Sequence, residues 1–172
     1  MRQGEVHRPY SYGQMSSMPF ANLTLRATAS GLEDEQVIAA ALGWLVGDDE
    51  AVVVERTKSW HGSPMHLVSL RLSRRGDIRR AMTGLGVELL SRLMSGLPSR
   101  MDEDNAIHFR LDLDALVCAR LVLCEARGPS VVKGRLKLRT FPGQEPVEVA
   151  RAALREVASK AGTPAAVNEQ EE

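Results

Sequence analysis

One ten-residue stretch, residues 131–140, restricts the fold more than any other part of the chain. It reads V-V-K-G-R-L-K-L-R-T, so that every second residue from position 133 is basic. Side chains alternate between the two faces of a β-strand. The stretch therefore predicts a strand that is apolar on one face and cationic on the other. The basic side chains of that face are Lys133, Arg135, Lys137 and Arg139.

The overall composition is that of an ordinary globular domain, but the charge is unevenly distributed. Of the 172 residues, 44% are hydrophobic and 26% are charged, and 22 basic residues balance 22 acidic ones. This size and composition are typical of one domain with its own core. Residues 51–100, however, hold nine basic and three acidic side chains. The charge of the contacting surface matters more than the net charge of the protein when the ligand is a polyanion.

Periodicity along the rest of the chain predicts strands alternating with helices. The predicted strands cover residues 19–30, 51–58, 65–72, 107–110, 120–124 and 131–140, with the last beside the fifth. Helices are predicted over 33–46, 74–97, 114–119 and 145–159, with Ser73 and Asp112 as N-caps. Neighbouring strands are close enough in sequence to form hairpins. The predicted fold is α+β, a two-layer sandwich with a largely antiparallel sheet and helices packed on one face.

The ends of the chain predict the domain boundaries, and its cysteines indicate the expected cellular location. Residues 1–17 have no period and predict a disordered leader, residues 18–160 a single domain, and residues 161–172 a disordered acidic tail. Cys118 and Cys124 form no C-x-x-C pair, and no secretory signal is present. No apolar run reaches the roughly 18 residues that a membrane span needs. The expected location is the reducing cytoplasm, without membrane attachment.

Motifs for catalysis, metals and nucleotides are missing from the sequence. There is neither a G-x-S-x-G nucleophile motif nor a phosphate-binding G-x-x-x-x-G-K-[ST] loop. His61 and His66 stand five residues apart across a turn, which matches no metal-ligand spacing. The sequence therefore predicts no enzyme, no cofactor and no metal. A hydrolase or nuclease using Asp102, Asp104, Asp112 or His61 stays as a minor alternative.

The predicted sheet carries further basic side chains on its cationic face, contributed by Arg26, Arg71 and Arg110. A plane of Arg and Lys can follow phosphates, whereas single-strand readers stack bases on aromatic residues. The only outward aromatic side chain expected near this face is Trp60, in the loop between the second and third strands. The sequence thus predicts backbone contacts to structured RNA. The predicted RNA-binding residues are Arg26, Lys58, Trp60, His61, Arg71, Arg74, Arg75, Arg110, Lys133, Arg135, Lys137 and Arg139.

Two other roles of the cationic face remain open at this point. Charges on an open sheet can simply prevent aggregation. The same alternation would also suit a protein-interaction module that forms a homodimer or docks an acidic partner through this face.

Three motifs resemble those of a known family. H-G-S-P-M at 61–65 precedes an apolar strand, I-H-F-R-L-D at 107–112 opens a short helix, and V-V-K-G-R-L-K-L follows at 131–138. In this order they resemble the archaeal family of predicted exosome-associated RNA-binding proteins, over roughly residues 18–159. The resemblance implies a fold similar to that of ribosomal protein L-five. It also implies RNA and an RNA-processing complex as partners.

Two positions depart from the family pattern. Ser63 stands where the family usually has Asn, and Leu113 where it often has Lys. Arg110 and Asp112 do match it. A structural ion pair between these two residues would explain the motif as well as RNA contact does.

Overall fold

The computed structural model describes residues 18–31, 33–125 and 130–161, which form an antiparallel sheet covered by helices on one face. The strands are β1 (Phe20–Ser30), β2 (Val52–Lys58), β3 (Pro64–Leu72), β4 (Ala106–Asp112) and β5 (Val131–Leu138), in the spatial order β2-β3-β1-β5-β4. The helices of the described ranges are α1 (Glu35–Val46), α2 (Arg75–Gly84), α3 (Val87–Ser95), α4 (Leu97–Arg100), α5 (Leu113–Val117) and α6 (Pro146–Lys160), with a 3-10 turn at Asp49–Ala51. The predicted α+β class and the antiparallel sheet are confirmed.

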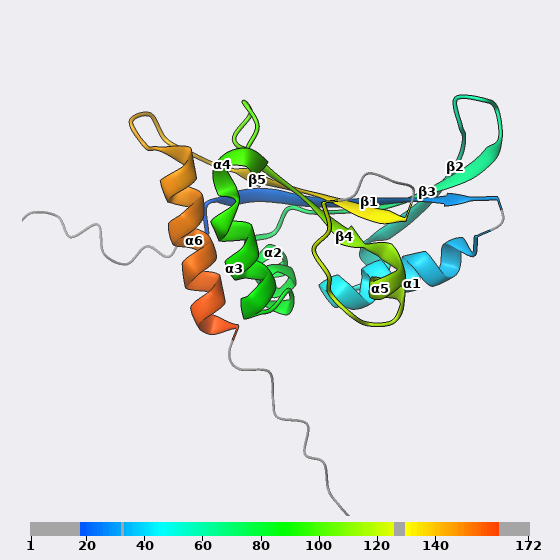
Figure 1. Ribbon diagram of the computed structural model, residues 1–172, viewed down its shortest axis with the longest axis horizontal. Helices are drawn as coiled ribbons and strands as arrows, with labels where there is room; N and C mark the ends of the chain where they lie inside the picture. Colours follow the sequence, from blue (N-terminus) through cyan, green and yellow to red (C-terminus); the bar gives the residue numbers. More distant parts are fainter. Residues whose placement is uncertain (1–17, 32, 126–129, 162–172) are drawn as a thin grey trace, which may run out of the picture.

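The sheet has two faces of opposite character because side chains alternate along every strand. We call the face toward the helices the inner face and the other the outer face; Figure 1 shows the sheet nearly edge-on, with the helices below it. The inner face and the helices supply one apolar core. Its fully buried large side chains are Leu25, Leu42, Ile78, Met82, Leu90, Leu93, Leu97, Ile107, Leu111, Leu116, Leu136 and Leu154. Each such side chain contributes about 1.5–3 kcal/mol when it is removed from water.

Gly134 occupies an inner-face position in the middle of β5, where a larger residue would be expected. It lies opposite Phe109 of β4 and Leu25 of β1. The ring of Phe109 fills the space next to it, because a Cβ built on Gly134 would be only 2.3 Å from the Phe109 Cζ. The aromatic ring thus replaces the missing side chain, a device that protects glycine within a sheet.

The predicted strand over 120–124 is wrong, and so is its pairing with the strand at 131–140. This segment makes one isolated bridge, Leu111 with Leu123, and two backbone hydrogen bonds to the edge of β4. They run from Asp112 N to the Val122 oxygen and from Cys124 N to the Arg110 oxygen, each 2.9 Å. β5 lies instead between β1 and β4. Proximity in sequence favoured the wrong neighbour, since pairing with β1 closes a much longer loop.

The predicted long helix over 74–97 is also wrong, because it is divided into α2, α3 and α4. Gly86 has a φ of 83°, which no α-helix contains, and it separates α2 from α3. The apolar spacing continues across this break, so periodicity alone concealed it. Arg74, not Ser73, is the N-cap residue of α2. The N-cap role predicted for Asp112 is confirmed, since its Oδ1 accepts from Ala115 N at 2.7 Å.

Two other predictions are affected by the observed boundaries. β5 ends at Leu138, so Arg139 lies beyond the strand as an exposed residue. The leader predicted over 1–17 and nearly all of the tail predicted over 161–172 lie outside the described residues. Within those described, no helix combines the length and apolar character needed to cross a membrane.

Candidate nucleic-acid interface

The outer face carries a row of three cations on three neighbouring strands. Lys133 of β5 lies directly opposite Arg26 of β1 on one side and Arg110 of β4 on the other. Directly opposed Cβ atoms in an antiparallel sheet are about 4.5–5.5 Å apart. Arg26 and Lys133 are exposed and Arg110 is half-buried. We call these three residues the basic row; none of them forms an ion pair with another described residue.

A second line of side chains crosses the sheet beside the basic row. Arg71 of β3 and Arg135 of β5 both lie opposite Thr24 of β1, and His108 of β4 lies opposite Arg135. Arg71 is exposed, and it also makes no ion pair within the described ranges. The structure therefore brings together four of the predicted residues, Arg26, Arg71, Arg110 and Lys133, as one uncompensated positive area.

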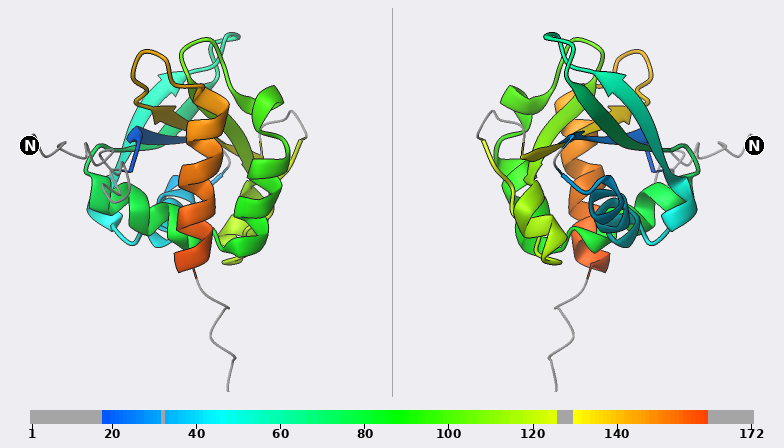
Figure 2. Two further views of the ribbon diagram at one scale, coloured as in Figure 1. Left: turned by 90° about the vertical axis from the view of Figure 1, so that its left-hand side faces the viewer. Right: turned by 90° about the vertical axis from the view of Figure 1, so that its right-hand side faces the viewer.

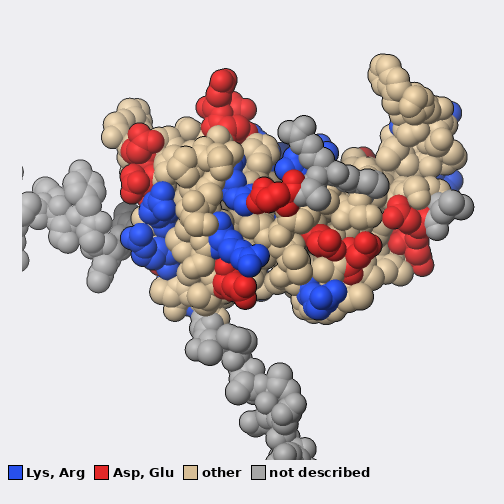
Figure 3. All heavy atoms as spheres, in the orientation of Figure 1, with Lys and Arg blue, Asp and Glu red and all other residues tan. Residues whose placement is uncertain are grey.

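The acidic turn before β4, residues 102–105, neutralises the other cations of β5. The Asp102 Oδ2 lies 2.5 Å from the His108 Nε2 and 4.0 Å from the Arg135 Nε. The Asp104 Oδ2 lies 3.8 Å from the Arg135 Nη2, and the Lys137 ammonium donates to the Asp104 carbonyl. In Figure 3 acidic side chains cover the projection at the place of this turn in Figure 1. Arg135 and Lys137 are thus less available to a ligand than the basic row.

Asp102 holds the acidic turn in shape. Its Oδ1 accepts hydrogen bonds from Asp104 N at 2.9 Å and Ala106 N at 3.0 Å. The hydrogen bond from His108, together with these two amides, holds the pKa of the Asp102 carboxyl below its ordinary value of 3.8, against the opposing effect of burial. A carboxylate with a depressed pKa stabilises the folded chain whenever the pH is above that ordinary value.

We expect Asp102→Asn to lower the free energy of unfolding by about 1 kcal/mol near pH 7, because the amide cannot replace the charge-assisted bond to His108. The contribution of the carboxylate is present above its ordinary pKa and disappears as pH falls through the depressed one. Urea unfolding at about pH 7 and pH 2 measures this. The difference between wild type and variant should vanish in acid; a difference that persists there would contradict the assignment.

The hairpin between β2 and β3 forms an arm that rises beyond the outer face, away from the helices (Figures 1 and 2). We define the arm as residues 58–64. Trp60 stands in its turn with 97% of its surface exposed, and Lys58 and His61 are exposed beside it. Gly62 has a φ of 82°, which allows the tight turn. These three predicted residues thus lie together, at one end of the sheet.

Three predicted residues lie apart from the basic row and the arm. Arg74 and Arg75 are exposed at the start of α2, which belongs to the helix layer. Arg139 is exposed beyond β5, where its backbone N–H donates to the Pro19 oxygen at 2.5 Å. The structure does not bring them into the same surface as the four cations of the outer face.

Sequence reasoning missed Phe141, which is 66% exposed in the loop between β5 and α6. This loop also projects on the outer side, at the opposite end of the molecule from the arm (Figure 1). Two features of the sequence indicate that Phe141 is exposed. Phe141 precedes Pro142-Gly143, a turn that brings its neighbours to the surface, and R-T-F at 139–141 repeats the basic–hydroxyl–aromatic order of K-S-W at 58–60.

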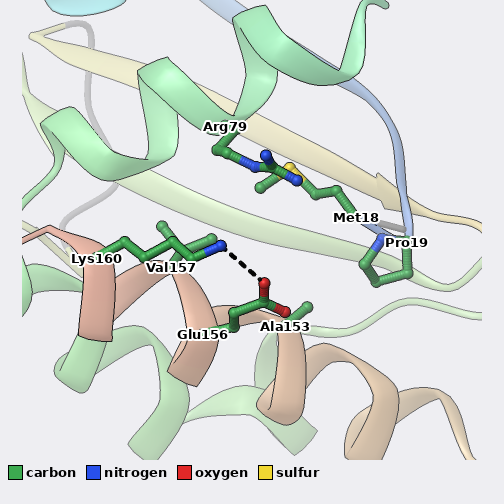
Figure 4. A pocket seen from close by; sticks show the side chains of 7 residues that line it. All are labelled: Met18, Pro19, Arg79, Ala153, Glu156, Val157 and Lys160. Atoms are coloured by element: carbon green, nitrogen blue, oxygen red, sulfur yellow. Dashed lines mark hydrogen bonds and ion pairs between the residues drawn. The ribbon is translucent and has the colours of Figure 1, made fainter. Parts of the chain in front are cut away.

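Two hollows among the described residues differ greatly in size. The crevice among Met18, Pro19, α2 and α6, drawn in Figure 4, has a volume of about 10 Å³, room for one water at most. A wider, open depression of about 690 Å³ borders α2, α3 and residues 121–123, and its charged side chains, Glu88 and Arg92, pair with each other at 3.8 Å.

The groups of the hydrolase alternative do not converge. Asp102 and Asp104 belong to the turn before β4, Asp112 caps α5 beyond the other end of that strand, and His61 stands on the arm. No three His, Cys, Asp or Glu side chains within the described ranges gather as metal ligands. Arg110 and Asp112 form no ion pair there either, so the structural explanation of that motif finds no support.

Comparison with solved structures identifies proteins of similar fold. The chain is similar in fold to a DUF54 protein from Methanothermobacter thermautotrophicus (24% identity, TM-score 0.66, covering 81% of this chain and 98% of that one). It is equally similar to one from Archaeglobus fulgidus (22%, TM-score 0.66, 80% and 99%), and less so to one from Sulfolobus solfataricus (16%, TM-score 0.59, 81% and 98%). No curated protein matches the chain.

A family model described as RNA binding matches residues 22–138. The matched region runs from within β1 to the end of β5 and so contains the basic row, the arm and the acidic turn. With more than half of its length matched, the chain belongs to this RNA-binding family.

Proposed function

We propose that this protein is a non-catalytic RNA-binding protein that contacts the RNA backbone through the outer face of its sheet. The basic row carries the proposal, because three directly opposed cations without a counter-charge form a ready site for phosphates. Family membership supports RNA as the ligand. The exposed side chains of Arg26, Lys133 and Arg71 provide the positions at which a backbone would be held.

The basic row destabilises the sheet, and a role in solubility alone does not explain why it is there. Like charges placed directly opposite each other in a sheet destabilise it, by up to about 1 kcal/mol for each pair. Lys133 takes part in two such pairs, with Arg26 and with Arg110. A surface that only prevents aggregation interleaves both signs of charge. A polyanion on this face would relieve the repulsion, which is the physical reason to expect one.

Backbone recognition fits the side chains around the basic row better than base recognition does. The outward residues between the cations include Thr24, Thr28 and Ser69, which are small and carry hydroxyl groups. None of these can stack on a base, whereas hydroxyls donate readily to phosphate oxygens. The central part of the outer face should therefore distinguish RNA by shape and charge.

An accessory role in RNA processing, which the family resemblance implies, belongs to the same proposal. No three His, Cys, Asp or Glu side chains of the described residues gather as metal ligands. In the proposed role the protein would assist processing by binding the substrate RNA or the enzyme that processes it.

The test is a salt titration of RNA binding by Lys133→Ala. We expect wild type to bind a blunt RNA duplex of about 16 base pairs, the length that one double-strand-binding domain spans. Plotted as log affinity against log salt, the slope for Lys133→Ala should be less steep by about 0.9, the effect of one lost phosphate contact. Fluorescence anisotropy at four or five salt concentrations measures both slopes.

Lys160→Ala is the matched control, since Lys160 lies in α6 of the helix layer and pairs with Glu156 at 3.1 Å. Its slope should equal that of wild type. Equal slopes for wild type and Lys133→Ala would refute the proposal. A homodimer built through the outer face predicts a different pattern: no RNA binding, and sedimentation that changes with protein concentration and with Lys133→Ala.

A further inference from the structure

Trp60 is exposed far beyond what an indole on a folded protein normally shows. It is 97% exposed in the turn of the arm, whereas Trp44 on α1 is 52% exposed. Burial of an aromatic side chain is strongly favourable, and tryptophan is enriched at interfaces, where its ring can be buried against a partner. Trp60 contributes nothing to the core. Its large apolar surface can be buried only against a partner that contacts the arm.

The arm itself carries basic but no acidic side chains. Residues 56–64 contain Arg56 and Lys58, and the nearest acidic residue of β2 is Glu55, which lies opposite Leu67. Phe141 makes an instructive comparison, because its loop also follows a strand and projects on the outer side. Its end of the sheet, however, adjoins the acidic turn, where Asn105 Nδ2 contacts the Thr140 hydroxyl at 3.3 Å. Repulsion by Asp102, Glu103 and Asp104 disfavours RNA there. At the other end, the acidic residues Glu33 and Glu35 lie at the base of the arm and not in its turn, beside Ser30 N (2.7 Å) and the His66 Nδ1 (3.9 Å).

The base of the arm lies beside a strand of the sheet that also carries one member of the basic row. β1 connects them, because Arg26 belongs to the row and Ser30 lies opposite Met65 at the base of the arm. Arg26 and Ser30 are four residues apart, a distance of ~13 Å along a strand. A duplex whose phosphates lie on the basic row would therefore bring its end, or an interruption in its pairing, close to the arm.

We propose that Trp60 stacks on an unpaired base next to the paired segment, so that the preferred ligand is an RNA junction between duplex and single strand. This inference rests on the proposed function. The basic row binds phosphates of the paired segment, and Trp60 of the arm stacks on the exposed face of an unpaired base. Stacking on an aromatic side chain tolerates any base, so the preference is for structure and not for sequence.

The experiment compares a blunt RNA duplex with the same duplex carrying an unpaired extension at one end. Wild type should bind the extended RNA more tightly. Trp60→Ala should remove this preference, by roughly 5- to 150-fold in affinity, the range found when one stacking residue is replaced by alanine. Affinity for the blunt duplex should stay unchanged, and Trp60→Phe should keep most of the preference. Phe141→Ala, the matched control, should behave as wild type on both RNAs.

Fluorescence gives a second readout that does not depend on affinity. The chain has two tryptophans, so Trp44→Phe leaves Trp60 as the single reporter. Its emission should be quenched by the extended RNA and not by the blunt duplex.

The outcomes separate the two proposals. If the blunt duplex binds with the expected salt slope but Trp60→Ala equals wild type on both RNAs, the inference about the arm is overturned and the basic row stands. If Phe141→Ala loses the preference instead, the stacking residue is misassigned. If neither RNA binds, both proposals fail.

Discussion

Gly134→Ala should lower the free energy of unfolding by about 1–3 kcal/mol, the usual cost of forcing extra atoms into a packed core. The new Cβ would lie 2.3, 2.4 and 2.6 Å from three atoms of the Phe109 ring, far inside contact distance. Phe109 is 3% exposed and has little room to move. Urea unfolding monitored by circular dichroism measures the change, which should be a shift of the midpoint with an unchanged slope.

Gly76→Ala is the matched control for this prediction. A Cβ at Gly76 meets nothing within 4 Å, and the residue lies in the first turn of α2. Alanine favours helix over glycine by about 0.5–1 kcal/mol, so this change should be neutral or stabilising. In a double-mutant cycle, Phe109→Leu should couple to Gly134→Ala by at least about 0.5 kcal/mol. Additive effects would show that Phe109 is not what fills the space at Gly134.

Replacing the whole basic row, by Arg26→Thr, Lys133→Thr and Arg110→Thr together, should have opposite effects on binding and stability. RNA affinity should fall about 100- to 1000-fold, because each phosphate contact is worth about 1–1.5 kcal/mol. The free energy of unfolding should rise, since two directly opposed like-charge pairs disappear and threonine suits a strand. Anisotropy at about 0.1 M salt and urea unfolding at the same salt measure the two effects.

The control removes three cations from the helix layer instead, by Arg92→Ala, Arg155→Ala and Lys160→Ala. These residues are exposed on α3 and α6, and the net charge changes equally. RNA affinity should change little in this variant. If both triple variants lose the same affinity, net charge and not the basic row attracts RNA. A basic-row variant that is less stable than wild type would show that its cations have structural partners.

Within each strand, sequence alone predicted the arrangement of side chains well. The alternation at 131–140 correctly placed Lys133, Arg135 and Lys137 on one face, because the direction of a side chain depends only on its own backbone. The Asp112 cap was predictable for the same reason, since its bond to Ala115 N spans three residues. Local periodicity failed where a break keeps the apolar spacing, as at Gly86 between α2 and α3.

Only the tertiary structure decided which cations act together. Strand order placed β5 between β1 and β4, so that Lys133 stands between Arg26 and Arg110, residues up to 107 positions away in sequence. The same packing brought Asp102 and Asp104 onto Arg135 and left the basic row uncompensated. Sequence by itself determined that a cationic face exists, because alternation is local. The pairing of distant strands determined which cations of that face have no acidic partner. The register of each strand and the identity of its neighbour depend on burying the shared apolar core, and sequence spacing alone does not specify them.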